Sequence, residues 1–131
     1  MRKSILLILL FTAVPSFAGD YTKHCYDKGL AKYEVYDCLS DIEERVKLKF
    51  KKKIIQLQKA AVELQHPRAI VSDEQVLRMT IAFESHLNKH CSLLGTSMLG
   101  TGYSQELTDC EIRFIQSRIN DIDYLIKHHY R

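Results

Sequence analysis

The chain contains an even number of cysteines, and all four follow a segment with the features of an export signal: Cys25, Cys38, Cys91 and Cys110. Disulfides form and persist in oxidising compartments outside the cytosol. Four cysteines allow three pairings, and spacing favours the local one, because 12 residues separate the first two, 18 the last two and 52 the inner two. An antiparallel bundle could also place an early cysteine beside a late one. We expect a small exported protein held by two disulfides.

The first 18 residues predict a cleavable export signal. Two basic residues follow the initiator methionine, an apolar stretch covers 5–14, and a small-x-small motif ends at Ala18. The apolar stretch is too short for a membrane-spanning helix, and no cysteine stands at the cleavage site to accept a lipid. We therefore expect cleavage before Gly19, a single domain over 19–131, and a periplasmic or secreted protein without membrane insertion.

The charge of the chain is close to balanced once the export signal is removed. The full sequence has 19 basic and 16 acidic residues, and two of the basic residues belong to the signal, so the mature net charge is +1. Nucleic-acid binding depends on many cationic contacts to phosphates. A near-neutral domain does not supply them, so we expect a protein partner and no nucleic acid.

Apolar residues recur at spacings of three and four in three segments, which is the pattern of amphipathic helices. These segments are 40–64, 73–93 and 107–125, with fraying near His128. The expected buried positions, segment by segment, are Ile42, Val46, Phe50, Ile54, Leu57, Ala61 and Leu64; Val76, Met79 or Thr80, Phe83, Leu87 and Cys91; and Leu107, Cys110, Phe114, Ile115, Ile119, Ile122 and Leu125.

Capping and breaking residues complete the expected fold. Ser72, followed by Gln75, has the pattern of a capping box at the start of the second helix. A short first helix, weakened by Gly29, is expected over 22–36, and several glycines mark an irregular loop over 95–104. No strand pattern competes with these helices. The sequence thus predicts an all-α fold, a small disulfide-stapled bundle of three to four helices.

Two histidines, His86 and His90, stand four apart on a predicted helix and could share a metal ion. The glutamate that a zinc-protease motif requires between them is missing, and Cys91 is better explained by a disulfide. Asp121 and Asp123 are two apart, on different sides of a helix, and there is no GxSxG motif. We expect no metal site, no cofactor and no catalytic residues, so the protein is not predicted to be an enzyme.

Two further groups of residues have both a structural and a functional interpretation. The lysine run over 47–53 could bind an anionic partner, but helical spacing favours a solvated face opposite the buried stripe. Tyr21, Tyr26, Tyr33 and Tyr36 gather near the mature N-terminus, where they could form an interface or pack a short helix on the bundle.

The cysteine framework resembles that of the LprI-like family of small exported proteins, named for a lysozyme inhibitor. Glu34 stands four residues before Cys38, Phe50 occupies an aromatic position on the next helix, Phe83 stands where the family usually has tryptophan, and Arg118 stands eight residues after Cys110. The resemblance covers essentially the whole mature chain. One departure is that Leu87 and Asn88 replace the family's usual Arg-Asp pair.

The resemblance implies an exported helical binding protein that inhibits a lysozyme-type glycosidase or another cell-wall hydrolase by occluding its cleft. The loop over 95–104 is the expected contact, because its glycines permit tight turns, Thr96, Ser97, Thr101 and Tyr103 offer hydrogen bonds, and a Cys91–Cys110 bridge would restrain it. The alternatives are an envelope immunity or adaptor protein that binds a different wall-degrading enzyme or toxin, and a structural envelope protein.

Overall fold

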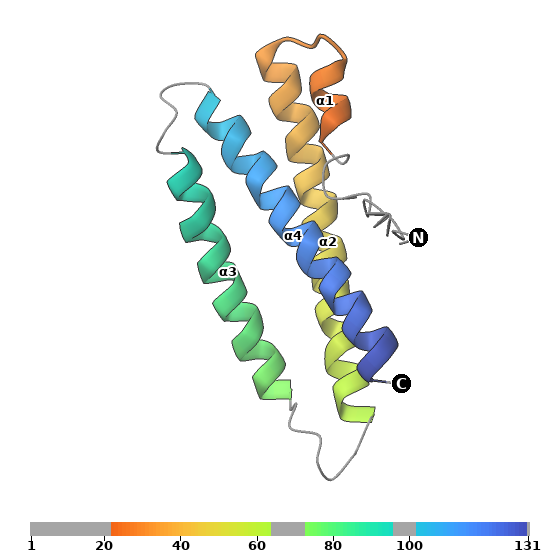
Figure 1. Ribbon diagram of the computed structural model, residues 1–131. Helices are drawn as coiled ribbons and strands as arrows, with labels where there is room; N and C mark the ends of the chain where they lie inside the picture. The colour runs from red at the N-terminus through yellow and green to blue at the C-terminus, as the bar shows by residue number, and fades with distance from the viewer. Residues whose placement is uncertain (1–21, 64–72, 96–101, 131) are drawn as a thin grey trace, which may run out of the picture.

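The computed structural model describes residues 22–63, 73–95 and 102–130, and these ranges form four α-helices and no strand. The helices are α1 (Lys23–Asp27), α2 (Lys32–Glu63), α3 (Asp73–Gly95) and α4 (Gly102–His129), and Figure 1 shows the three long ones lying side by side. The all-α helical bundle predicted from the sequence is confirmed. The predicted export signal, the capping residue Ser72 and residues 96–101 of the predicted loop lie outside the described residues.

The expected single helix over 22–36 is wrong, because the chain turns at Gly29. This glycine has a φ of 60°, in the left-handed region that other residues enter only at a cost. The long helix therefore begins at Lys32, earlier than its apolar stripe suggested. Glu34 Oε2 accepts a hydrogen bond of 2.8 Å from the backbone N–H of Ala31. Because this is the reach-back contact of a capping box, it fixes the start of α2.

The core lies between α2 and α4, with α3 packed across both. Ile112, Ile119 and Ile122 of α4 are fully buried. Burial of one such side chain contributes roughly 1.5–3 kcal/mol. Facing them are mainly apolar side chains of α2 and α3: Leu39, Ile42, Val46, Phe50, Leu57, Val76 and Leu87. This repeat of three and four residues on facing helices is what holds the bundle together.

The sequence left open whether Met79 or Thr80 is the buried residue in the second turn of α3, and Thr80 is the more buried of the two. Its hydroxyl donates a hydrogen bond of 2.8 Å to the Val76 carbonyl, whereas Met79 is 44% exposed. The hydroxyl of a threonine can satisfy itself against the helix backbone four residues earlier, so it tolerates a partly buried position.

Both ends of α4 extend beyond the predicted limits. The helix begins at Gly102, so Tyr103 and Ser104 are helical rather than part of a loop. It continues to His129, and the ring of His128 lies 4.5 Å from that of Tyr124, between centroids. The helix therefore ends one residue beyond His128, close to the predicted position, and this ring contact one turn apart supports its last turn.

None of the helices within the described ranges combines the length and the apolar character needed to cross a membrane.

Candidate protein-binding surface

Two disulfides tie together one end of the bundle. Cys25 pairs with Cys38, which joins α1 to α2, and Cys91 pairs with Cys110, which joins α3 to α4. Figure 1 shows that α1, the start of α2, the end of α3 and the start of α4 lie at the same end of the bundle, and the four cysteines belong to these segments. We call residues 22–40, 91–95 and 102–113 the stapled end. The local pairing is the one that spacing favoured, and two such bridges indicate a protein that works outside the cytoplasm.

A polar contact adds to the two bridges at the stapled end. Gln105 Nε2 donates a hydrogen bond of 2.8 Å to the backbone carbonyl of Lys32, which links the first turn of α4 to the first turn of α2. A carbonyl at the start of a helix can accept this additional bond because it has two lone pairs. The first turns of α2 and α4 are therefore held in register.

A hollow of about 380 Å³ opens beside this contact. Its lining residues come from the first turns of α2 and α4: Lys32, Tyr33, Tyr36, Ser104 and Gln105. Tyr33 is 70% exposed and Tyr36 is 43% exposed. Tyrosine is enriched in protein interfaces, because its ring supplies a large apolar area with little loss of side-chain entropy and its hydroxyl can hydrogen-bond. Exposed rings around a hollow on a cross-linked scaffold form a suitable docking surface.

Tyr26 of α1 lies near charged residues of α4. Partial burial and the carboxylates of Asp109 and Glu106 raise the pKa of Tyr26 to about 12, against a smaller opposing effect of Arg113. Arg113 is itself paired with Asp109 at 2.8 Å, between Nη2 and Oδ2. Asp109 Oδ1 is buried and accepts no hydrogen bond from any described residue, so the carboxylate lacks a full set of donors.

The residues predicted to contact a partner fall in two groups. Thr96, Ser97 and Thr101 lie outside the described residues. Tyr103 is half-buried in the first turn of α4, next to Ser104 at the edge of the hollow. The interpretation of Tyr103 as part of a free loop is therefore wrong, because the helix begins before it.

A second cluster, Glu43, Lys47 and Glu111, lies between α2 and α4. Lys47 Nζ pairs with Glu43 and lies 3.5 Å from Glu111 Oε2. Burial and a hydrogen bond to Glu43 raise the pKa of Glu111. Burial would also raise the pKa of Glu43, but hydrogen bonds from Glu111 and Lys47 together outweigh it and lower this pKa. The two carboxyl groups therefore differ in acidity, with Glu43 the stronger acid, and Lys47 compensates negative charge on both.

This cluster borders a cavity of about 240 Å³ between α2, α3 and α4. Phe50 and Phe83 line it, with ring centroids 5.4 Å apart, and the Arg118 guanidinium carbon lies 5.9 Å from the Phe83 centroid. A cation so placed over a ring contributes about 0.5–1 kcal/mol at a solvent-exposed site. Leu87 and Asn88, the two positions at which the chain departs from the family pattern, line the same cavity.

The lysine run does not form a purely solvated face. Lys47 pairs with Glu43 and Glu111, and Lys53 Nζ lies 2.5 Å from Asp123 Oδ1 on α4. Lys47 is nevertheless exposed, as expected, whereas Lys53 is half-buried, because its long apolar stem reaches round the helix to α4. Lys49, Lys51 and Lys52 are exposed, as expected.

The two histidines of α3 differ in their surroundings. His86 is exposed, whereas His90 is half-buried with its ring centroid 4.6 Å from that of Phe114 on α4. His90 is therefore better described as a packing residue than as a solvent-facing one. Among the described residues, the group with ligand atoms close enough together for a metal ion is instead His24, Cys25 and Cys38.

Three comparisons with known proteins found no match. No family model matches the chain, and neither a curated protein nor a solved structure is found to match it.

Two functional groupings were not visible in the sequence. Glu43 and Glu111 come from different helices, so their contact depends on the register of α2 against α4. The sequence signal for the second grouping, His24 with Cys25 and Cys38, was that His24 directly precedes Cys25. The approach of the His24 ring to Cys38 depends on the turn at Gly29.

Proposed function

We propose that this protein is an exported binding protein, periplasmic or secreted, whose stapled end docks into the substrate cleft of a lysozyme-type glycosidase and blocks it. The observation that carries the proposal is the pair of exposed rings, Tyr33 and Tyr36, around a hollow on a doubly cross-linked scaffold. The resemblance of the cysteine framework to that of a lysozyme-inhibitor family supports the choice of partner.

Inhibition by occlusion needs shape and rigidity rather than chemistry on the inhibitor. Glycoside hydrolysis uses two carboxyl groups on either side of the scissile bond, in a cleft open to the polysaccharide. A protrusion that fills the cleft excludes the substrate. The bridges at Cys25–Cys38 and Cys91–Cys110 reduce the entropy lost on docking, because they restrain the helix ends before binding. In this proposal the protein is not an enzyme.

The charge around the hollow suits a basic partner better than the net charge suggests. Glu34 and Asp37 are exposed beside Tyr33 and Tyr36 and outnumber Lys32, the one cationic residue that lines the hollow, while the lysine run begins further along α2. Complementary charge at the edge of an interface mainly increases the rate of association. The local surface at the first turns of α2 can therefore steer a cationic glycosidase toward the stapled end.

The test measures inhibition of lysozyme on a suspension of bacterial cell walls, with the oxidised mature protein and two variants. Tyr33→Ala/Tyr36→Ala should raise the inhibition constant by about 30-fold or more, since interface hot spots are worth about 2 kcal/mol or more. The matched control is Tyr124→Ala, which removes a 59% exposed tyrosine far along α4 and should leave inhibition unchanged.

Two outcomes would contradict the proposal in different ways. An absence of inhibition by the correctly oxidised protein would remove lysozyme as the partner and favour an immunity or adaptor role toward another wall-degrading enzyme. Equal inhibition by the wild-type and the doubly substituted protein would keep the partner but remove the tyrosine surface.

A further inference from the structure

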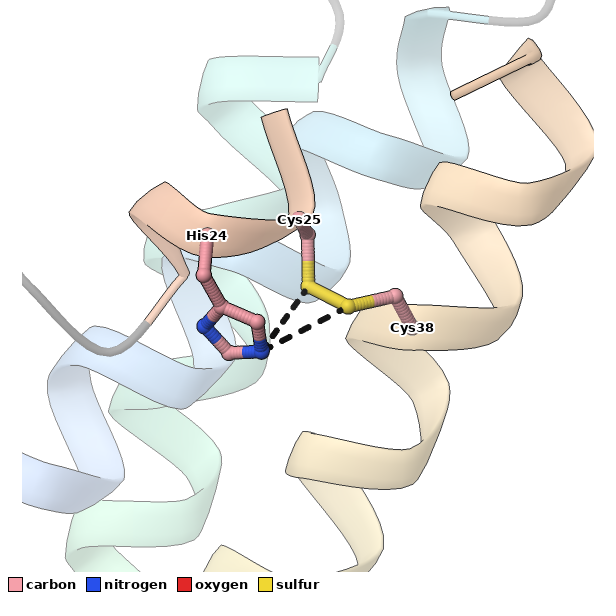
Figure 2. A group of neighbouring side chains, drawn as sticks. All are labelled: His24, Cys25 and Cys38. Carbon is pink, nitrogen blue, oxygen red and sulfur yellow. Dashed lines mark hydrogen bonds between the residues drawn. A yellow bond between two sulfur atoms is a disulfide. The ribbon is translucent and has the colours of Figure 1, made fainter. Parts of the chain in front are cut away.

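The imidazole of His24 lies against the sulfur atoms of the Cys25–Cys38 disulfide. His24 Nε2 is 3.7 Å from Cys38 Sγ and 3.9 Å from Cys25 Sγ. Figure 2 shows the ring, which belongs to α1, turned toward both sulfurs, with the same nitrogen facing each of them. One nitrogen and two sulfurs therefore meet at the junction of α1 and α2.

We propose that, when this disulfide is reduced, His24, Cys25 and Cys38 bind one zinc-type divalent ion. The proposal does not depend on the identity of the partner, because it rests on the chemistry of three side chains of α1 and α2. It assigns His24 the role of a metal ligand and makes metal binding conditional on the redox state of the two cysteines.

The geometry already approximates that of a tetrahedral site. With Zn–N of about 2.0–2.1 Å and Zn–S of about 2.3 Å, a nitrogen and a sulfur ligand stand about 3.6 Å apart. The two nitrogen–sulfur separations here, 3.7 and 3.9 Å, lie within a few tenths of this value. Only the sulfurs must separate, to about 3.8 Å in such a site. Rotation of the two cysteine side chains can supply this, since their Cα atoms are 5.8 Å apart.

The ligand set suits a borderline-soft metal ion. Two thiolates and one imidazole are donors that zinc prefers, whereas magnesium and calcium prefer oxygen. Nε2 must be unprotonated to bind, so the ring proton resides on Nδ1, and the exposure of His24 lets solvent accept its hydrogen bond. No other His, Cys, Asp or Glu of the described residues joins the group, so water supplies the fourth ligand.

A dithiol reductant supplies the electrons. One of its thiolates attacks Cys38 Sγ, the more exposed sulfur, and Cys25 leaves as a thiolate. The second thiol of the reductant then displaces Cys38, and the reductant departs as a disulfide, so two electrons have passed to the protein. The metal ion then binds both cysteine sulfurs as thiolates and releases the remaining thiol protons to solvent.

The second disulfide provides an internal comparison. Cys91 is fully buried and Cys110 is 2% exposed, so both sulfurs are shielded from a reductant. Within the described part of the chain, no set of three ligand-capable side chains includes either of them. The metal ion would thus replace the bridge between α1 and α2 and leave the bridge between α3 and α4 untouched.

The experiment titrates the full mature protein with Co²⁺, a spectroscopic substitute for zinc, before and after anaerobic reduction with a phosphine. The reduced protein should bind one equivalent, with thiolate-to-cobalt charge-transfer absorption and the intense visible bands of a tetrahedral ion, and the oxidised protein should show neither. His24→Ala should bind at least about tenfold more weakly, because even residues that only orient metal ligands change affinity by 10–100-fold. The matched control, His86→Ala, should bind as the wild type does.

Alkylation in the presence of zinc identifies the sulfurs even if reduction unfolds part of the chain. Metal should protect Cys25 and Cys38 from alkylation and leave Cys91 and Cys110, once reduced, unprotected. Protection of the second pair, an unchanged affinity in His24→Ala, or equal cobalt spectra of the oxidised and reduced proteins would each overturn the proposal.

Discussion

Truncation of Ile119 tests whether the α2–α4 interface is the stabilising core. Ile119 is fully buried in α4, and Ile119→Ala removes three carbon atoms from the interface. At about 0.8 kcal/mol per buried carbon the transfer loss is roughly 2.4 kcal/mol. The cavity left behind adds to this, so the total loss should be about 3–4 kcal/mol, within the usual range of about 2–5 kcal/mol for such changes.

The matched control is Ile81→Ala on α3, which makes the same chemical change at a residue that is 57% exposed. Both positions are helical, so both gain the few tenths of a kcal/mol by which alanine exceeds isoleucine in helix propensity. The control should therefore be neutral or slightly stabilising. Urea denaturation of the oxidised protein measures both free energies of unfolding, and the slope m should not change. A loss below about 1 kcal/mol for Ile119→Ala, or an equal loss for both variants, would refute the assignment of the core.

Three further predictions concern single residues. In a tyrosinate absorbance titration, one tyrosine should ionise near pH 12, and this step should be missing in Tyr26→Phe. Because the pKa of Tyr26 is raised from 10.0, the contribution of Tyr26 to stability should be lost in the wild type as the pH rises from 10 toward 12. Glu111→Gln should become more stable relative to the wild type as the pH rises from 4.5 toward neutrality. The raised pKa of Glu111 means that its ionisation costs folding free energy, and glutamine avoids this cost. Thermal melts of the two proteins that shift in parallel with pH would contradict this. Gly29→Ala should cost about 1–2 kcal/mol in urea denaturation from its left-handed φ alone, since a Cβ there would meet no neighbour, and an unchanged midpoint would show that the turn is not required.

The long amphipathic helices were predictable because their signal is local. Spacings of three and four identify the buried side chains of α2 from Ile42 to Ala61 almost completely. Leu39 was missed because it precedes the predicted helix, and two residues of α4 were missed for other reasons. Ile112 is fully buried but lies beside the stripe that the spacing suggested, and Gln116 is a buried polar residue whose amide donates to Asn120 Oδ1 at 3.1 Å. A pattern of apolar residues cannot register a polar side chain that is satisfied within its own helix.

Helix limits and the candidate site depended on contacts that the local sequence does not encode. The helix α2 begins before its predicted start because Glu34 caps it. The helix α4 begins before Leu107 because Gln105 hydrogen-bonds across to α2. The hollow at Tyr33 and Tyr36 combines residues about 70 positions apart in sequence, as Ser104 and Gln105 form its other wall. The tyrosines could be singled out from composition, whereas the surface that they form required the packing of two helix ends.

The most direct test of the proposed interface is hydrogen exchange of the oxidised protein with and without a saturating amount of lysozyme. Our account predicts slower exchange at the stapled end, in residues 22–40 and 102–113, and unchanged exchange at the opposite end, in residues 52–63 and 73–84. Backbone amides covered by a partner exchange more slowly because opening toward solvent is restricted. Slower exchange confined to the opposite end, or no difference anywhere at saturation, would contradict the assignment of the stapled end as the binding surface.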